Sequence, residues 1–259
     1  MCLILLAWRA HPEYPLVVAA NRDEFFERPT APAQFWTDAP GILGGRDLSA
    51  GGTWMGITRD GRFAALTNYR EPGRQRADAP SRGRLVGDFL VGSMAAPDYL
   101  ATLQPIAAAY NGFNLICGTM AQELWHFSNR GGQAQALAPG IYGQSNHLLD
   151  TPWPKVAQGK SDLALALAAL PADEPLLELL RDESIHDDGR LPRTGVSLEW
   201  ERILSAAFVR APNYGTRSST VVLFDKAGVI VFDEQTYLPG AQLADRKRFR
   251  FSLDRGAPC

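Results

Sequence analysis

The amino-acid sequence predicts an α+β fold in which antiparallel β-sheets are covered on their outer faces by helices. Apolar runs come in pairs that are separated by short turns, which is typical of β-hairpins. Helical patterns gather in two separate blocks, at residues 82–108 and 154–205, instead of alternating with single strands. Segregated blocks favour antiparallel sheets over a doubly wound parallel sheet. No linker or change of composition divides the 259 residues, so we expect a single domain over residues 1–259.

The first hairpin places a cysteine beside a polar run. Residues 2–8 and 16–20 are apolar, and residues 9–15 between them contain two prolines and are expected to turn. Paired antiparallel strands lie about 5 Å apart, so the open end of this hairpin brings Cys2 close to residues 21–24. Those four residues are all polar: Asn21, Arg22, Asp23 and Glu24.

The remaining elements follow from the same signals. Residues 29–53 are rich in glycine and are expected to form a loop, as is the polar segment 70–80. The charged tail at 245–248 is expected to be exposed. The expected strands are 54–59, 62–68, 113–118, 121–128, 139–145, 217–224 and 229–236.

Composition and charge exclude several classes of function. The formal net charge is −2, which argues against a general nucleic-acid partner. The apolar start of the chain is short and lacks a basic region, so it predicts neither a secretion signal nor an integral membrane segment. The cysteines and histidines have no metal-ligand spacing, so we expect no metal site. Three cysteines that lie far apart fit a reduced, cytoplasmic setting.

Cys2 is the leading candidate for a nucleophile. Removal of Met1 is expected, because methionine aminopeptidases act when the second side chain is small. Removal would leave a cysteine that carries both a thiol and a free α-amine. The α-amine has a pKa of about 7.7–8.0 and can act as the base for its own thiol. The alternative interpretation is a small apolar residue on a buried strand.

The polar run after the second strand supplies charges for that thiol. Asp23 is expected to orient the α-ammonium group, and Arg22 is expected to stabilise a thiolate, because a nearby cation lowers the pKa of a thiol. Asn21 and Glu24 are expected to bind substrate beside them, and Glu24 can also support Arg22. The alternative interpretation of all four residues is a solvated strand end.

Two asparagines and an arginine complete the expected catalytic group. Asn68 and Asn146 each follow an expected strand, and a side-chain amide can stabilise the oxyanion that forms when an amide bond is attacked. Arg217 opens the last hairpin and is expected to bring a second positive charge. Turn formation is the alternative for the asparagines, and a solvent-exposed strand end is the alternative for Arg217. Trp54 and Tyr69 are the further expected substrate-binding residues.

With these residues assembled, the sequence resembles the NRDE family, also called the transport and Golgi organisation 2 family. The resemblance runs from end to end and rests on ordered motifs. They are the Met1-Cys2 start, Asn21-Arg22-Asp23-Glu24, Gly44-Gly45-Arg46-Asp47 with Gly51-Gly52-Thr53-Trp54-Met55-Gly56, Leu66-Thr67-Asn68-Tyr69-Arg70, Ser145-Asn146, Pro152-Trp153-Pro154-Lys155 and Thr216-Arg217-Ser218-Ser219-Thr220.

The family in turn is similar to the choloylglycine and penicillin V hydrolases, which are N-terminal-nucleophile (Ntn) hydrolases. This resemblance implies a four-layer αββα sandwich of two antiparallel sheets flanked by helices. The residues that match those of the enzymes are Asn21, Asp23, Asn68, Asn146 and Arg217. The position of the enzymes' second-strand arginine falls on Ala20 here, and Arg22 lies two residues along, on the same face of the strand.

Three functions follow as expectations. The first is hydrolysis, in which the Cys2 thiolate attacks a linear amide or related acyl bond of a small molecule without a cofactor. The second is non-catalytic binding and trafficking of haem, an acyl lipid or acyl-coenzyme A in the same cleft. The family's links to Golgi organisation, lipid homeostasis and haem transfer imply this function, with haem as a ligand and Cys2 as its axial ligand. The third is a scaffold with a decayed site, which Ala20 alone favours.

Overall fold

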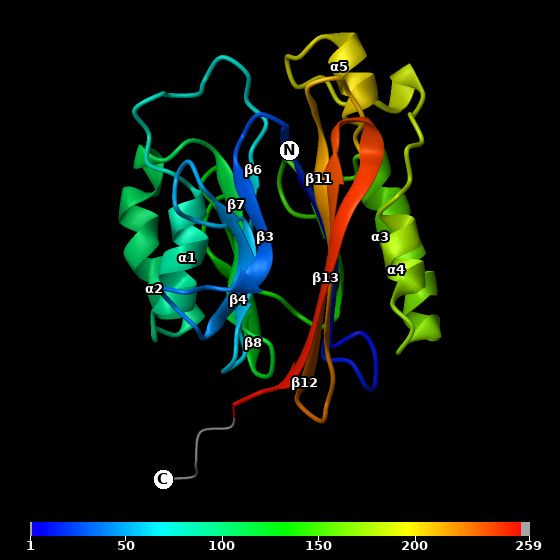
Figure 1. Cartoon of the computed structure of the whole chain (residues 1–259). Helices are drawn as coiled ribbons and strands as arrows, with labels where there is room; N and C mark the ends of the chain where they lie inside the picture. The colour runs from blue at the N-terminus through cyan, green and yellow to red at the C-terminus, as the bar shows by residue number, and fades with distance from the viewer. Residues whose placement is uncertain (1, 255–259) are drawn as a thin grey trace.

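The computed structural model describes residues 2–254. Two antiparallel sheets lie face to face, and helices cover the outer face of each sheet (Figure 1). This arrangement confirms the predicted α+β fold with four αββα layers. Met1, whose removal is expected, and Cys259 lie outside the described residues.

The first sheet contains the predicted N-terminal hairpin. It has six strands in the order β10-β1-β2-β11-β12-β13. Strand β1 (Cys2–Trp8) pairs with β2 (Leu16–Phe25), and the register sets Cys2 opposite Arg22. The other strands are β10 (Gly140–Gln144), β11 (Tyr214–Phe224), β12 (Val229–Leu238) and β13 (Gln242–Ser252).

The second sheet has seven strands in the order β3-β4-β5-β6-β7-β8-β9. All neighbouring pairs are antiparallel, so the sheet runs in chain order as a meander. Its strands are β3 (Thr30–Phe35), β4 (Ile42–Asp47), β5 (Met55–Thr58), β6 (Arg62–Asn68), β7 (Phe113–Thr119), β8 (Glu123–Ser128) and β9 (Gln135–Ala136).

Each sheet has its own helical layer. Helices α1 (Gly83–Val91) and α2 (Ala96–Leu103) cover the second sheet, and α3 (Pro154–Ala166) and α4 (Glu174–Leu179) cover the first (Figure 1). Helix α5 (Leu198–Ile203) lies at one end of the sandwich, at the top of Figure 1. Within residues 2–254, none of the helices combines the length and the apolar character that crossing a membrane requires.

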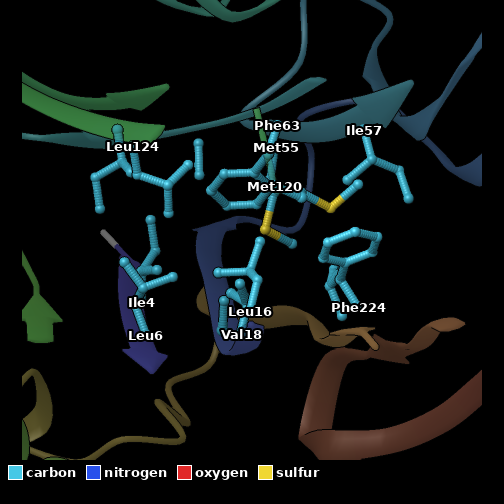
Figure 2. Close-up of a cluster of buried hydrophobic side chains, with 14 of the residues drawn as sticks. Ile4, Leu6, Leu16, Val18, Met55, Ile57, Phe63, Met120, Leu124 and Phe224 are labelled. Atoms are coloured by element: carbon cyan, nitrogen blue, oxygen red, sulfur yellow. The ribbon is translucent and has the colours of Figure 1, made fainter. Parts of the chain in front are cut away.

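The continuous apolar run of β1 follows from burial on both of its faces. Successive side chains of a strand point to opposite sides of the sheet. Ile4 and Leu6 therefore pack between the two sheets, where Figure 2 shows them facing Phe63 and its neighbours on the second sheet. Leu3 and Leu5 pack against the helical layer. Each buried side chain of this size contributes about 1.5–3 kcal/mol to folding, so the apolar contacts on both faces hold Cys2 at the end of a rigid strand.

The prediction of a loop over residues 29–53 is wrong, because β3 and β4 lie within it. Glycines suggested a loop, but Gly44 serves a different purpose. A Cβ atom at this position would lie 2.7 Å from the carbonyl oxygen of Met55. Glycine here allows β4 to approach the neighbouring chain closely, as glycines inside strands often do.

The tail at 245–248 is exposed, as predicted, but it lies within an edge strand, β13, that the charge pattern did not indicate. Arg246 and Arg248 reach back to the fully buried carboxylate of Asp233 on β12, at 2.8 Å and 2.5 Å. Charged side chains are common on edge strands, where they prevent pairing with other chains. These ion pairs fasten the last strand to the sheet.

The predicted helical block at 154–205 is present as three separate helices, α3, α4 and α5. Residues 191–197, between a short 3-10 turn and α5, are not helical. Pro192 and Gly195 interrupt the helix there, since proline lacks the amide hydrogen and Gly195 adopts a positive φ of 99°. The non-helical segment leads directly into the end of the molecule that holds the candidate site.

Candidate functional site

Cys2 lies on the wall of a pocket of about 370 Å³. Its exposed fraction is 8%, so only a small part of the residue reaches the pocket. Ser145 Oγ donates a hydrogen bond to the backbone carbonyl of Cys2 at 3.0 Å, which fixes the start of β1 against the chain that follows β10. Asn68, at the end of β6, and Trp54, which precedes β5, line the same pocket. The thiol therefore sits where the two sheets meet a solvent-accessible cavity.

Asp23 lines the pocket from β2 and is almost completely buried. Thr216 Oγ1 donates to Asp23 Oδ1 at 2.7 Å, and the Tyr214 hydroxyl donates to the backbone carbonyl of Asp23 at 3.1 Å. Burial raises the pKa of this carboxyl group, while the charge of Lys155, the Thr216 hydrogen bond and the charge of Arg22 lower it. The structure thus brings the predicted nucleophile and the predicted orienting carboxylate to one place.

The electrostatic setting keeps the thiol protonated. Burial raises the pKa of Cys2, the Asp23 carboxylate raises it further, and Arg22 acts in the opposite direction. Arg22 Nη2 lies 3.9 Å from a carboxylate oxygen of Glu24, so part of its charge is balanced. A thiol with a raised pKa is a weak nucleophile and requires a base nearby.

Lys155 is a buried cation beside this group, and the sequence did not indicate a chemical role for it. It lies in the first turn of α3, and its exposed fraction is 3%. Its ammonium group lies 3.4 Å from the carbonyl oxygen of Ala206. Burial lowers the pKa of Lys155 to about 8, and the charges of Asp23 and Cys2 oppose that shift. The Trp-Pro-Lys run was visible as a motif, but its burial beside Asp23 depends on how α3 packs against β1.

The two predicted asparagines are brought together, in different roles. Asn68 lines the pocket, and no hydrogen bond joins its side-chain amide to the other residues that the structure describes. Asn146 is fully buried, and its Nδ2 donates to the backbone carbonyl of Asn68 at 2.8 Å. The backbone amide of Arg70 donates to the Asn146 carbonyl at 2.7 Å. Asn68 is therefore available to a ligand, whereas Asn146 holds the end of β6 in position.

Asn21 is not brought to the pocket. Its side chain is fully buried and donates to the carbonyl oxygens of Leu180 and Ala207, at 2.7 and 2.8 Å. Ser219 Oγ donates to Asn21 Oδ1 at 2.7 Å. These bonds tie β2 to the helical layer and to β11, because the alternation of strand faces turns Asn21 away from the side on which Cys2 and Arg22 lie opposite one another.

Arg217 also lies away from the thiol. The register between β2 and β11 shifts between Thr216 and Ser218, so Arg217 is the extra residue of a bulge. Its guanidinium group donates to the carbonyl oxygens of Phe25 and Arg28, at 2.9 and 3.1 Å. The group lines a separate, smaller cavity instead of the Cys2 pocket.

A second pocket, of about 480 Å³, adjoins the Cys2 pocket. Glu24, Arg28, Asn68 and Arg82 line both, so the two form a continuous surface. Tyr69, a predicted substrate-binding residue, lines only the second pocket. Its apolar and aromatic lining residues are Phe25, Pro72, Val196, Trp200, Leu204 and Tyr214, and its remaining polar lining residues are Arg70, Glu71, Gln75 and Asn146.

Helix α5 closes one side of that second pocket through a buried ion pair. Arg70 Nη1 lies 2.8 Å from Glu201 Oε2, and both side chains are 4% exposed. The hydroxyl of Thr194 donates to the other carboxylate oxygen at 2.7 Å. A paired, hydrogen-bonded charge of this kind fixes orientation more than it adds stability. No cluster of three or more potential metal ligands occurs within residues 2–254.

Comparisons with known proteins place the chain among named relatives. A model of the family described as Transport and Golgi organisation 2 matches residues 1–239. The chain is 40% identical over 260 residues to the Transport and Golgi organization protein 2 homolog of Bos taurus, and 36% identical to that of Homo sapiens. Both alignments cover 92% of this chain and 94% of the relative. The Drosophila melanogaster Transport and Golgi organization protein 2 is 30% identical over 263 residues, covering 91% and 92%.

Two solved structures share the fold. The C2A mutant of a conjugated bile acid hydrolase from Clostridium perfringens superposes with a TM-score of 0.52 at 9% identity, covering 99% of this chain and 94% of that one. A Caenorhabditis elegans N-acylethanolamine-hydrolyzing acid amidase ortholog has a TM-score of 0.50 at 12% identity, covering 86% and 92%. At these identities the likeness concerns the Ntn-hydrolase fold alone. The matches to the family and to its animal members together show that this chain belongs to the Transport and Golgi organisation 2 family.

Proposed function

We propose that this protein is an N-terminal-nucleophile hydrolase that uses Cys2 to cleave a linear amide or related acyl bond of a small molecule. The observation that carries the proposal is the position of Cys2 and Asp23 at the end of the first hairpin, where Cys2 pairs with Arg22, the residue before Asp23, and where both Cys2 and Asp23 line one pocket. The fold supports the reaction class, because the two structures above are named as hydrolases of conjugated bile acids and of N-acylethanolamines.

The proposed reaction begins after Met1 has been removed. The α-amine of Cys2 takes the thiol proton, which is needed because burial raises the pKa of that thiol. Asp23 accepts a hydrogen bond from the resulting α-ammonium group and holds it beside the sulfur. The sulfur attacks the carbonyl carbon, and the α-ammonium group returns its proton to the leaving amine as the C–N bond breaks. Water then cleaves the acyl-thioester and frees the acid.

Three other residues support this reaction. Asn68 donates its free side-chain amide to the oxyanion that forms on the carbonyl oxygen. Asn146 is a positioning residue, since it holds the Asn68 backbone. Lys155 acts through Asp23, because its buried positive charge favours the ionised form of that carboxyl group.

The lining of the second pocket favours a substrate whose acyl chain lies in that pocket while its amide bond lies near Cys2. It shares Asn68 with the Cys2 pocket and is lined by side chains such as Phe25, Trp200 and Leu204. A hydrocarbon chain placed there removes apolar surface from water, which is favourable by about 25 cal/mol per Å². The scissile bond then lies between the apolar pocket and the polar Cys2 pocket.

The test is turnover of a panel of N-acyl amides by the purified protein and by two variants. Cys2→Ala should abolish hydrolysis, and wild-type protein trapped with substrate should carry the acyl mass on the Cys2 peptide. Cys117→Ala is the matched control, because it removes a buried thiol from the other sheet. Turnover retained by Cys2→Ala, or an intact mass that still includes Met1 in active protein, would reject the mechanism.

The arginines of the Cys2 pocket favour a second candidate, which is binding and trafficking of haem or an acyl lipid or acyl-coenzyme A. Arg28, Arg76 and Arg82 line the pocket, and guanidinium groups pair well with carboxylates and phosphates. A titration with haemin and with acyl-coenzyme A tests it. A haem carrier is supported by a saturable haemin signal that Arg82→Gln weakens and Cys2→Ala abolishes, while Cys2→Ala leaves binding of acyl-coenzyme A unchanged. A Soret band that changes without saturation contradicts haem binding.

A further inference from the structure

A third cavity, of about 150 Å³, lies on the other side of Arg22 from the thiol. It shares only Arg22 and Trp54 with the Cys2 pocket. Its walls come from β2, β11, β12 and β13 of the first sheet and from β3 and β4 of the second. The polar side chains that face it include Arg217, Ser218, Glu234 and Thr236. The hydrolase proposal assigns no role to this cavity.

Two arginines face this cavity without a close carboxylate partner. The nearest carboxylate oxygen to Arg22 is that of Glu24, at 3.9 Å, and Arg22 Nη1 is buried without a hydrogen bond to any described residue. Within residues 2–254, Arg217 donates hydrogen bonds to backbone carbonyls and, at 3.3 Å, to the hydroxyl of Thr30, and to no carboxylate. Burial lowers the pKa of Arg217, and the positive charge of Arg22 lowers it further. Two like charges that repel each other beside a cavity favour an anion between them.

The carboxyl group in the cavity wall does not fill that role. Glu234 Oε1 accepts a hydrogen bond from the backbone amide of Ala33 at 2.6 Å, so this oxygen is directed at β3. Its other oxygen accepts from Thr220 Oγ1 at 3.4 Å. Burial raises the pKa of Glu234 to about 7, although the Ala33 and Thr220 hydrogen bonds and the charge of Arg22 oppose the shift. Below neutral pH this group is therefore mostly uncharged and leaves the two arginines unbalanced.

The charged groups around Glu234 come from four strands. They are Arg22 on β2, Arg217 on β11, Arg46 on β4 and Lys247, the register partner of Glu234 on β13. Arg46 is already paired with Asp38, with its two terminal nitrogens 2.5 and 2.7 Å from the carboxylate oxygens. Lys247 is paired with Asp245 at 3.0 Å. Arg22 and Arg217 remain the cations available to a ligand.

We propose that this cavity binds a small oxyanion, a carboxylate or a phosphate group, between the guanidinium groups of Arg22 and Arg217. The hydroxyls of Ser218 and Thr236 lie in the same wall and can donate to further oxygens of the anion. The volume of about 150 Å³ admits a group of a few non-hydrogen atoms, such as a carboxylate or a phosphate. The anion is either free in solution or the charged end of a ligand that reaches past Arg22 from the Cys2 pocket.

The first arm of the test measures binding of acetate and of inorganic phosphate by calorimetry and thermal unfolding. It uses the Cys2→Ala protein, so that the result does not depend on whether the protein is a hydrolase. We expect saturable binding that Arg217→Gln weakens at least tenfold. Arg82→Gln is the matched control, because Arg82 lines only the two larger pockets, and it should leave the affinity unchanged.

Glu234→Gln should strengthen acetate binding at pH 8, whereas Arg217→Gln should weaken it. A gain in affinity cannot result from a variant that merely unfolds. Acetate keeps its charge between pH 6 and pH 8, whereas Glu234 ionises in this range. Acetate binding should therefore weaken from pH 6 to pH 8 in the parent protein and stay constant in Glu234→Gln. Binding that Arg82→Gln abolishes and Arg217→Gln spares would overturn the proposal by placing the anion in the Cys2 pocket.

The second arm distinguishes the two sources of the anion. Matched N-acyl amides with and without a terminal carboxylate are added to the same Cys2→Ala protein. A larger thermal shift for the carboxylate compound, lost in Arg217→Gln, identifies the cavity as a site for the charged end of a ligand. Binding of acetate without such a difference identifies a site for a free anion. If acetate, phosphate and the carboxylate compound all fail to bind saturably, the proposal is overturned.

Discussion

Two buried cysteines, one in each sheet, have opposite surroundings. Cys117 lies in the middle of β7, is fully buried among apolar side chains, and pairs across the sheet with Ala64 and Trp125. Burial raises its pKa far above the usual value, and only the charge of Arg62 opposes that shift. Cys2 is nearly as buried, yet it lies at a strand end on the wall of a pocket.

Both thiols have an arginine and a carboxylate within electrostatic reach, namely Arg62 and Glu123 for Cys117, so the two differ in the buried lysine and the pocket that lie beside Cys2 alone. Cys2 has Asp23, Arg22 and Lys155 within electrostatic reach, and Asp23 is itself held by Thr216. Burial alone makes a thiol inert, because the thiolate is costly to form away from water. A buried thiol becomes useful only when a base, an orienting charge and an opening to substrate are all beside it. The predictions below test whether those neighbours are what separates the two cysteines.

The largest effect is expected from Asp23→Asn. The amide has the shape of the carboxyl group but carries no charge, so it no longer orients the α-ammonium group or favours its protonated form. Since proton transfer by a positioned group contributes about 10²–10⁴-fold, the rate constant for acyl-thioester formation should fall by that factor. Single-turnover kinetics measures it, and circular dichroism checks the fold. A loss of less than about tenfold contradicts the role of Asp23.

A smaller effect is expected from Lys155→Met, which removes the buried charge and keeps the length of the side chain. Lys155 lowers the pKa of Asp23, so its removal raises that pKa. Hydrolysis requires the ionised carboxylate, and the acidic limb of the pH–rate profile should therefore move to higher pH. A shift of about one pKa unit corresponds to about tenfold in rate on that limb.

Lys160→Met is the matched control for that variant, because Lys160 lies on the same helix but is partly exposed and paired with Asp150. It should leave the pH–rate profile unchanged. Lys155→Arg should restore most of the wild-type profile if charge is what matters. A profile for Lys155→Met that is lowered equally at every pH would show that Lys155 only supports the structure.

The smallest effect on activity is expected at the other cysteine. Cys117→Ala should leave turnover within about twofold of wild type, because Cys117 lines none of the three pockets described above. It should lower the free energy of unfolding by about 1 kcal/mol, since a buried atom is removed from a packed core. Urea denaturation measures the loss. Faster alkylation of Cys117 than of Cys2 in the folded protein would contradict the conclusion that Cys2 is the more reactive thiol.

Local patterns in the sequence were sufficient to predict the first hairpin and the position of Cys2 at its open end. Two apolar runs around a proline-containing turn predict that Cys2 lies close to residues 21–24, and in the structure Cys2 pairs with Arg22. The side chains that the structure then arranges differently are Asn21 and Arg217. The alternation of β2 turns Asn21 to the helical side of the sheet, and the packing of that layer decides which carbonyl groups it meets there. The direction of the Arg217 side chain depends on a β-bulge that no sequence pattern predicted.

The sequence by itself determined the layered α+β fold, the hairpin that carries Cys2, and the polar run that returns to it. These features depend on periodicity and short turns, which act between residues close along the chain. Only the tertiary structure decided that Lys155 lies beside Asp23 and that Thr216 donates to it across 193 positions of sequence. It also decided which arginines face a cavity. Such placements follow from how separate layers pack, and buried charge interactions between distant segments leave no periodic trace in the sequence.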